Sequence, residues 1–171
     1  DVYQVYEEEF SVDWVRCIRQ NSDMTERERE EFLEEFQSRE GTLVGFCVLG
    51  GIFSEGVDLT GESLIGAIIV GTGLPQIGSE REILKEYYDR KKQSGFDYAY
   101  RYPGMNKVLQ AAGRVIRTDN DKGIILLLYD RFLTKEYELQ YPREWDKIYP
   151  CDAGCVSEYI DDFWKGMTAD D

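Results

Sequence analysis

Three stretches of the chain are almost wholly apolar, and they alternate with segments in which apolar residues recur at helical spacing. The apolar stretches cover residues 43–49, 64–70 and 123–129. Strands that are apolar on both sides indicate a parallel sheet buried on both faces, with helices as the connections. The pattern therefore predicts an α/β fold with a parallel sheet covered by helices on both faces.

Shorter patterns predict the remaining elements. A strand is expected at residues 15–19, and helices at 2–10, 25–38, 80–93, 103–117 and 159–164. Thr25 and Glu28 have the spacing of a capping box, which marks a helix start. Pro103 suits the first turn of the helix that it opens. Because the chain has no repeat, low-complexity run or linker, residues 1–171 are expected to form a single domain.

Charge and composition narrow the class of protein. The 171 residues are 42% hydrophobic, enough for one domain with a core. There is no apolar run of ~18 residues for a membrane span and no signal-peptide pattern, so a cytoplasmic protein is expected. The net charge of −14 argues against a general nucleic-acid binder. Residues 80–135 are the exception, with twelve Lys and Arg against eight Asp and Glu.

Histidine is absent, which excludes Ser–His and Cys–His nucleophiles. Of the four cysteines, Cys17 and Cys47 lie in apolar segments and are expected to be small core residues. Cys151 and Cys155 are four apart, so a disulfide or half of a metal site stays open. A closed zinc site would need all four thiolates to converge, so we expect no metal site.

Residues 110–117, Gln-Ala-Ala-Gly-Arg-Val-Ile-Arg, are the most informative segment. On a helix, one face would carry the polar and glycine positions Gln110, Gly113, Arg114 and Arg117. The opposite, core-facing side would carry Val108, Ala112, Val115 and Ile116. Two guanidiniums on one face suit a transferring phosphoryl group. The alternative is a solvated basic face.

Two glycine-containing loops follow predicted strands. The first, residues 50–59, combines three glycines with polar side chains that can orient water, a ribose hydroxyl or an arginine, although it can also be an ordinary turn. Its polar and glycine positions of interest are Ser54, Glu55, Gly56 and Asp58. The second, residues 70–75, is a poor dinucleotide loop, because Gln76 replaces the third glycine and Pro75 interrupts the helix start.

Three tyrosines interleave with an arginine just before the 110–117 segment: Tyr98, Tyr100, Arg101 and Tyr102. Aromatic rings beside a cation can stack on single-stranded bases. They can equally pack around the loop, and both interpretations stay open.

Taken together, these segments resemble superfamily two helicases, specifically the DinG/XPD branch of DNA helicases. Residues 51–59 resemble motif V and residues 110–117 resemble motif VI. Residues 70–75 fall where that branch carries a related loop. Residues 121–132 resemble the strand and Asp-Arg-Phe ending that follow motif VI, and residues 98–105 look like the bacterial DinG-like form. The resemblance covers roughly residues 24–146.

The resemblance implies the second RecA-like motor domain of an ATP-dependent DNA helicase. ATP would bind between this domain and the N-terminal RecA-like domain of the same polypeptide. Carried over by position, Arg114 and Arg117 would be arginine fingers on the γ-phosphate, and Gln110 would position the nucleotide or its water. The residues that would couple nucleotide state to bound DNA are Ser54, Glu55, Gly56 and Asp58.

Several further expectations follow from the resemblance. The chain lacks a phosphate-binding loop, so ATP and Mg²⁺ would be held mainly by the other half, and the isolated chain would be inactive. Any iron–sulfur cluster would also belong to that half. We expect the domain to be truncated at its first strand. Its other partner would be single-stranded DNA, in a cytoplasmic, nucleoid-associated protein. The alternative is a stand-alone RecA-like interaction domain without ATPase activity.

Overall fold

The computed structural model describes residues 2–10, 12–38, 41–54, 59, 63–118, 121–145 and 147–168. The chain divides into two compact units, Asp1–Leu128 and Tyr129–Asp171, and each is described by itself. All strands formed by the described residues lie in the first unit. The assignment of the whole chain to one domain stays a prediction.

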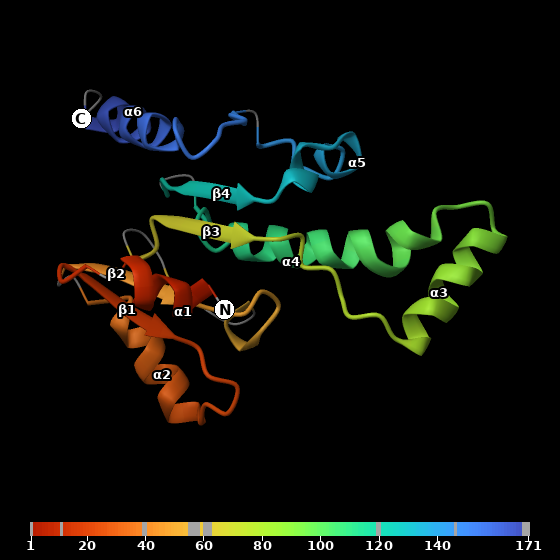
Figure 1. Cartoon of the computed structure of the whole chain (residues 1–171), viewed down its shortest axis with the longest axis horizontal. Coiled ribbons are helices and arrows are strands. Elements are labelled where there is room, and N and C mark those ends of the chain that lie inside the picture. Colours follow the sequence, from red (N-terminus) through yellow and green to blue (C-terminus); the bar gives the residue numbers. More distant parts are fainter. Residues whose placement is uncertain are drawn as a thin grey trace. The chain divides into compact units, whose positions relative to one another are not determined.

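The strands form two parallel pairs (Figure 1). The first pair is β1 (Val15–Arg19) with β2 (Thr42–Phe46), and the second is β3 (Gly66–Val70) with β4 (Ile124–Leu128). Parallel partners need a crossover connection, and helices provide it in both pairs. The predicted parallel α/β fold class is therefore confirmed, and the strand expected at residues 15–19 is found there.

Helix α2 (Glu26–Glu35) crosses over from β1 to β2 and begins with the predicted capping box. The Thr25 hydroxyl oxygen accepts the Glu28 N–H at 3.3 Å, and the Glu28 carboxylate accepts the Thr25 N–H at 2.7 Å. The helix buries Phe32, whose ring stacks on that of Phe53 with centroids 4.4 Å apart. Phe53 belongs to the short 3-10 helix η2 (Ile52–Ser54), so α2 is joined to the chain that follows β2.

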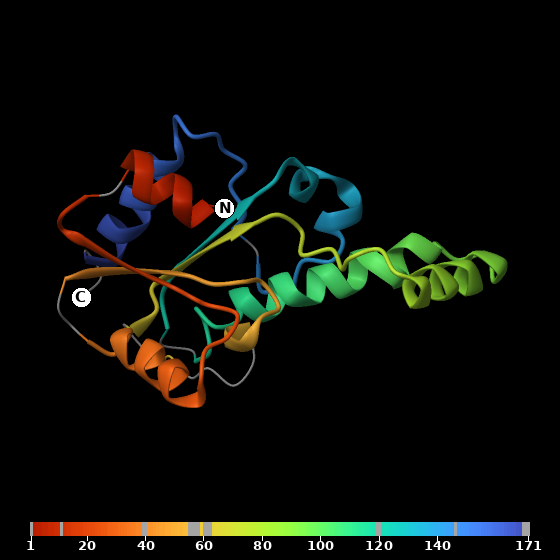
Figure 2. The same cartoon turned by 60° about the horizontal axis from the view of Figure 1, so that its bottom comes forward.

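A helical arm connects β3 to β4 and extends away from both strands (Figures 1 and 2, green). It comprises α3 (Ser79–Arg90), the π-helix η4 (Asp97–Arg101) and α4 (Tyr102–Ala112). The Tyr100 hydroxyl donates to the Glu82 carboxylate, and the Arg81 guanidinium donates to the Ala99 carbonyl at 3.1 Å. These two hydrogen bonds between side chains of α3 and residues of η4 hold these two helices of the arm together.

The core of the first unit lies where α4 packs on β3. Met105, Val108 and Ala112 of α4 are at most 1% exposed, and Ile69 of β3 is 4% exposed. Alternate residues of β3 point the other way, and Ile68 is 64% exposed. The expectation that this strand is buried on both faces is therefore wrong, because α4 covers one face only.

The ends of the chain are helical. At the start lie α1 (Val2–Val5) and the π-helix η1 (Tyr6–Phe10), where the sequence predicts a helix. The second unit contains the 3-10 helix η5 (Asp130–Leu133), α5 (Lys135–Glu138) and α6 (Val156–Thr168). In that unit the Tyr141 hydroxyl donates to the Phe132 carbonyl at 2.7 Å, and burial raises the pKa of Tyr141 to about 12.

Candidate functional site

The helix that leads to the two candidate arginines ends earlier than the sequence predicts. α4 stops at Ala112, and a tight turn follows in which the Val115 N–H donates to the Ala112 carbonyl at 3.0 Å. Bonds to the third preceding residue narrow the last turn of a helix. Gln110 therefore lies on α4, whereas Arg114 and Arg117 lie beyond it. The predicted single helical face is wrong.

Two anchors fix the turn that carries the arginines. Val115 is 2% exposed and lies against Gly123, where an added Cβ would be 2.3 Å from Val115 Cγ1. The Asp121 carboxylate accepts the N–H of Arg117 at 2.9 Å and that of Thr118 at 2.8 Å. The backbone that presents the arginines is thus held to the start of β4 by packing and by hydrogen bonds.

The side chains at the end of α4 differ in exposure. Gln110 and Arg117 are exposed, and Arg114 is half-buried. Ile116, which the sequence places on the core side, is 42% exposed, because the turn leaves the helical spacing. Gln110 and Arg114 stand one helical turn apart, so the structure keeps them at the same end of α4. Their chemical roles stay predictions.

The opposite end of α4 contacts the loops that follow β2 and β3. An added Cβ on Gly104 would lie 2.6 Å from the Thr72 carbonyl oxygen, so only a glycine allows this approach. Gly73 has φ +62 and lies against Leu49. An added Cβ on Gly73 would be 2.9 Å from Leu49 Cδ2. Gly73 of the 71–75 loop thus serves the packing of α4, whereas Gly71, with φ +82, has open space around an added Cβ and serves the conformation of the loop.

Lys107, which the sequence analysis did not single out, lies beside both loops. An added Cβ on Gly50, which has φ +77, would be 2.7 Å from Lys107 Cδ, and one on Gly73 would be 3.6 Å from Lys107 Cβ. Lys107 is half-buried and forms no ion pair with any residue that the structure describes. Its position within the predicted helix, three residues before Gln110 and therefore on the same face, was the available signal.

The loop of residues 50–59, which we call the coupling loop, is described mainly at its start. η2 ends at Ser54 and contacts α4. The side chain of Ser54 lies outside the described part of the chain, as do Glu55, Gly56 and Asp58. Their roles stay predictions.

Tyr100 and Arg101 face the inside of the arm. Tyr100 is 5% exposed, and its hydrogen bond to Glu82 raises the pKa of the phenol. Arg101 pairs with Asp97 at 2.6 Å, with side chains 19% and 16% exposed. These contacts leave the Tyr100 ring no open face for a base and support the packing interpretation for both residues.

Tyr98 and Tyr102 lie nearer the surface of the arm. Tyr98 stacks on Tyr88 with ring centroids 3.9 Å apart, and its other neighbour, Tyr102, meets it edge-on at 5.2 Å. Tyr102 is 39% exposed. The Tyr102 ring is therefore the more accessible of the two, and its contact with nucleic acid stays a prediction.

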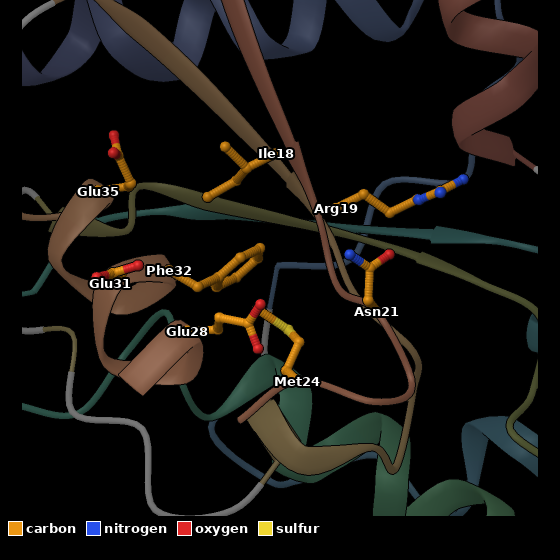
Figure 3. Close-up of a pocket in the computed structure, with 8 residues that line it drawn as sticks. All are labelled: Ile18, Arg19, Asn21, Met24, Glu28, Glu31, Phe32 and Glu35. Atoms are coloured by element: carbon orange, nitrogen blue, oxygen red, sulfur yellow. The ribbon is translucent and has the colours of Figure 1, made fainter. Parts of the chain in front are cut away.

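A hollow of about 320 Å³ lies beside α2, and Gln110, Arg114 and Arg117 are not among the residues that line it (Figure 3). Glu28, Glu31 and Glu35 line it together with Arg19. Glu31 pairs with Arg27, Glu35 pairs with Arg16, and Glu28 caps the helix. A wall of carboxylates repels phosphates, so this hollow is unsuited to a nucleotide.

The described residues contain neither a metal-ion cluster nor a membrane-spanning helix. Within them no three acidic or cysteine side chains are placed to hold a metal ion, and no helix has the length and apolar composition to cross a bilayer. All four cysteines are free thiols. Cys47 is exposed, so its prediction as a core residue is wrong, and Cys17 is half-buried in β1.

Several curated proteins share sequence with the chain. It is 33% identical over 119 residues to the regulator of telomere elongation helicase 1 homolog of Caenorhabditis briggsae, covering 63% of this chain and 12% of that protein. It is 31% identical over 118 residues to a probable ATP-dependent helicase of Methanocaldococcus jannaschii, and the match covers 64% of this chain and 18% of that protein. The Drosophila melanogaster homolog of the telomere helicase is 36% identical over 110 residues, covering 60% and 11%. The chain thus spans less than a fifth of these relatives.

Solved structures share the fold. One described as XPD helicase has a TM-score of 0.58 at 21% identity and covers 75% of this chain and 23% of its own. A second, described as XPD apo, also has a TM-score of 0.58, with 72% and 25% covered. The family of helicase C-terminal domains matches residues 1–148. The chain therefore belongs to the helicase C-terminal domain family, which agrees with the resemblance of its motifs to the DinG/XPD branch.

Proposed function

We propose that the chain is the second motor domain of an ATP-dependent DNA helicase. In this proposal Arg114 and Arg117 complete an ATP site whose phosphate loop belongs to an N-terminal RecA-like domain of the same polypeptide. The observation that carries the proposal is the anchored turn after α4, in which Asp121 and the buried Val115 fix the backbone of the arginines. Cations preorganised before the substrate arrives stabilise developing phosphoryl charge without a cost of reorganisation.

Each side chain at this end of α4 then has a distinct task. The Arg114 and Arg117 guanidiniums contact the γ-phosphate oxygens as negative charge redistributes over them. Gln110, exposed on the last turn of α4, positions the nucleotide or the attacking water. Because the sequence has no phosphate-binding loop, the proposal assigns Mg²⁺ mainly to the N-terminal domain.

The coupling of nucleotide state to DNA is assigned to Ser54, Glu55, Gly56 and Asp58. Support comes from the start of this loop, because η2 contacts α4, the helix that leads to the arginine turn. One stiff element therefore touches the beginning of the coupling loop and ends beside the arginines. Single-stranded DNA is the proposed partner, and an iron–sulfur cluster, if the full-length protein has one, belongs to the other half.

The proposal is tested by ATP hydrolysis of the full-length protein, with and without single-stranded DNA. Arg117→Ala should lower the DNA-stimulated rate by about 10³-fold or more, with an unchanged unfolding temperature. Arg27→Ala is the matched control, because Arg27 is exposed on α2 and pairs only locally with Glu31. It should leave the rate unchanged.

The outcomes separate the two functions considered. Full activity of Arg117→Ala would remove the arginine-finger role. Absence of ATP hydrolysis in the unmodified protein would instead favour an interaction domain that kept the fold without the motor. In that case the arginines would form a phosphate-binding surface only.

A further inference from the structure

The end of α3 has an unusual backbone. Among the non-glycine residues that the structure describes, only Lys92 has a positive φ, 57°. It occupies the position after the helix cap, where the Lys92 N–H donates to the Asp89 carbonyl and the Gln93 N–H to the Tyr88 carbonyl, both at 3.0 Å. This is the hydrogen-bond pattern in which helices favour glycine, since a side chain strains the left-handed conformation. A lysine here is a less stable choice than glycine.

The side chains around Lys92 form an exposed basic and aromatic group. Lys91 lies over the Tyr87 ring, with its Nζ 4.5 Å from the centroid, and Tyr87 is 49% exposed. Arg90 pairs with Glu86 at 3.1 Å. Lys92 is exposed and forms no ion pair within the described part of the chain. We call Tyr87, Lys91 and Lys92 the arm tip.

Helix stability explains part of this group. Cations in the last turn of a helix interact favourably with its dipole, which accounts for Arg90 and Lys91. It does not account for Lys92, whose conformation disfavours a side chain. A strained residue in a solvated turn points to a contact made by its side chain.

We propose that the arm tip binds single-stranded nucleic acid, with Lys92 and Lys91 on backbone phosphates and the Tyr87 ring against a base. This inference rests on the proposed function, and it adds a contact outside the segments that resemble motifs V and VI. Exposed aromatic rings next to cations are the combination that binds single strands without sequence preference. The arm also lies in residues 80–135, where basic residues outnumber acidic ones in a chain of net charge −14.

The test measures binding of a fluorescent oligothymidylate to the full-length protein over a range of salt concentrations. Each lost phosphate contact on a single strand should reduce the salt slope by about 0.7, which corresponds to about fivefold weaker binding at 0.1 M salt. Lys92→Gly should show this loss and an equal or higher unfolding temperature, because glycine relieves the backbone strain. Lys135→Gln, which removes one exposed charge from α5, should bind like the unmodified protein.

The aromatic contact has its own pair of variants. Tyr87→Ala should weaken binding by about fivefold or more, because a stacking ring is lost. Tyr87→Phe keeps the ring and should bind normally.

The outcomes distinguish this inference from the function on which it rests. Normal DNA-stimulated hydrolysis with unchanged affinity of Lys92→Gly and Tyr87→Ala would overturn the arm tip alone. Failure of the unmodified protein to bind the oligonucleotide would overturn both. An arm tip that binds polyglutamate as well as the oligonucleotide, with equal losses in the variants, would assign it to an acidic protein surface and overturn the nucleic-acid assignment.

Discussion

The carboxylate of Asp121 holds the backbone of Arg117, whose N–H it accepts at 2.9 Å. The same oxygen accepts the N–H of Thr118 at 2.8 Å. One side chain thus closes the turn that carries the arginines onto the residues just before β4. The position of the Arg117 guanidinium depends on this closure, although Asp121 itself need not touch a substrate.

Asp121→Ala should therefore impair hydrolysis through Arg117. Loss of the two hydrogen bonds loosens the turn, and misplacement by about 1 Å can cost about 10²-fold in rate. We expect kcat for DNA-stimulated hydrolysis to fall by about 10- to 100-fold with little change in the KM for ATP. Asp121→Asn, which keeps an acceptor oxygen, should retain most of the rate. Equal rates for all three proteins would contradict the positioning role.

Gly104→Ala should destabilise the first unit. An added Cβ would meet the Thr72 carbonyl oxygen at 2.6 Å, so α4 or the loop after β3 has to shift. Overpacking of this kind costs about 1–3 kcal/mol in the free energy of unfolding, which urea denaturation measures.

Gly166→Ala is the matched control for the Gly104 substitution. Gly166 also lies within a helix, α6, but nothing lies within 4 Å of its added Cβ. Alanine is the better helix former, so this change should stabilise the protein by up to about 1 kcal/mol. Equal effects of the two substitutions would show that the contact with Thr72 is unimportant.

Thr25→Ala should weaken the start of α2 by about 1 kcal/mol, the usual cost of losing an N-cap. Hydrogen bonds from the Thr25 N–H and then the Thr25 hydroxyl lower the pKa of Glu28 below its ordinary 4.5. The stability that this carboxylate contributes is complete above pH 4.5 and is lost as the pH falls through the lowered pKa. The difference between the two proteins in thermal unfolding should therefore shrink in acid. A difference independent of pH would show that the bond between the Thr25 hydroxyl and the Glu28 carboxylate does not contribute to it.

Tyr100 and Tyr102 should respond differently to substitution. Tyr100→Phe removes the hydrogen bond to Glu82 inside the arm, so it should lower the unfolding temperature slightly and leave oligonucleotide binding unchanged. Tyr102→Ala removes a ring that is 39% exposed and should weaken binding. Weaker binding by Tyr100→Phe with an unchanged unfolding temperature would contradict this division.

Features that depend on neighbouring residues were predictable from the sequence. The strand Val15–Arg19 and the capping box of Thr25 with Glu28 occur where the pattern placed them. The family was also accessible, because the segments 51–59 and 110–117 together are specific. Local propensity and local hydrogen bonds dominate these features, so no distant contact overrides them.

The end of α4 was not predictable in the same way. The spacing from Gln110 to Arg117 suits a helix, and Gly113 keeps a helical φ of −66. Beyond the end of the helix, Val115 packs against Gly123, and the helical spacing of the sequence does not indicate this contact. The open face of β3 was not predictable either. Both Ile68 and Ile69 are apolar, and the composition of the strand does not show that Ile69 is buried while Ile68 is exposed.

The close contact between Gly104 and Thr72 fixes α4 near its first turn. An α-helix of eleven residues is about 16 Å long and bends little over that length. A rotation of α4 about this contact would move α3 and η4 one way and the turn that carries Arg114 and Arg117 the other way. If the arm binds a strand as we propose, force on the arm would reach the two arginines through this single stiff helix.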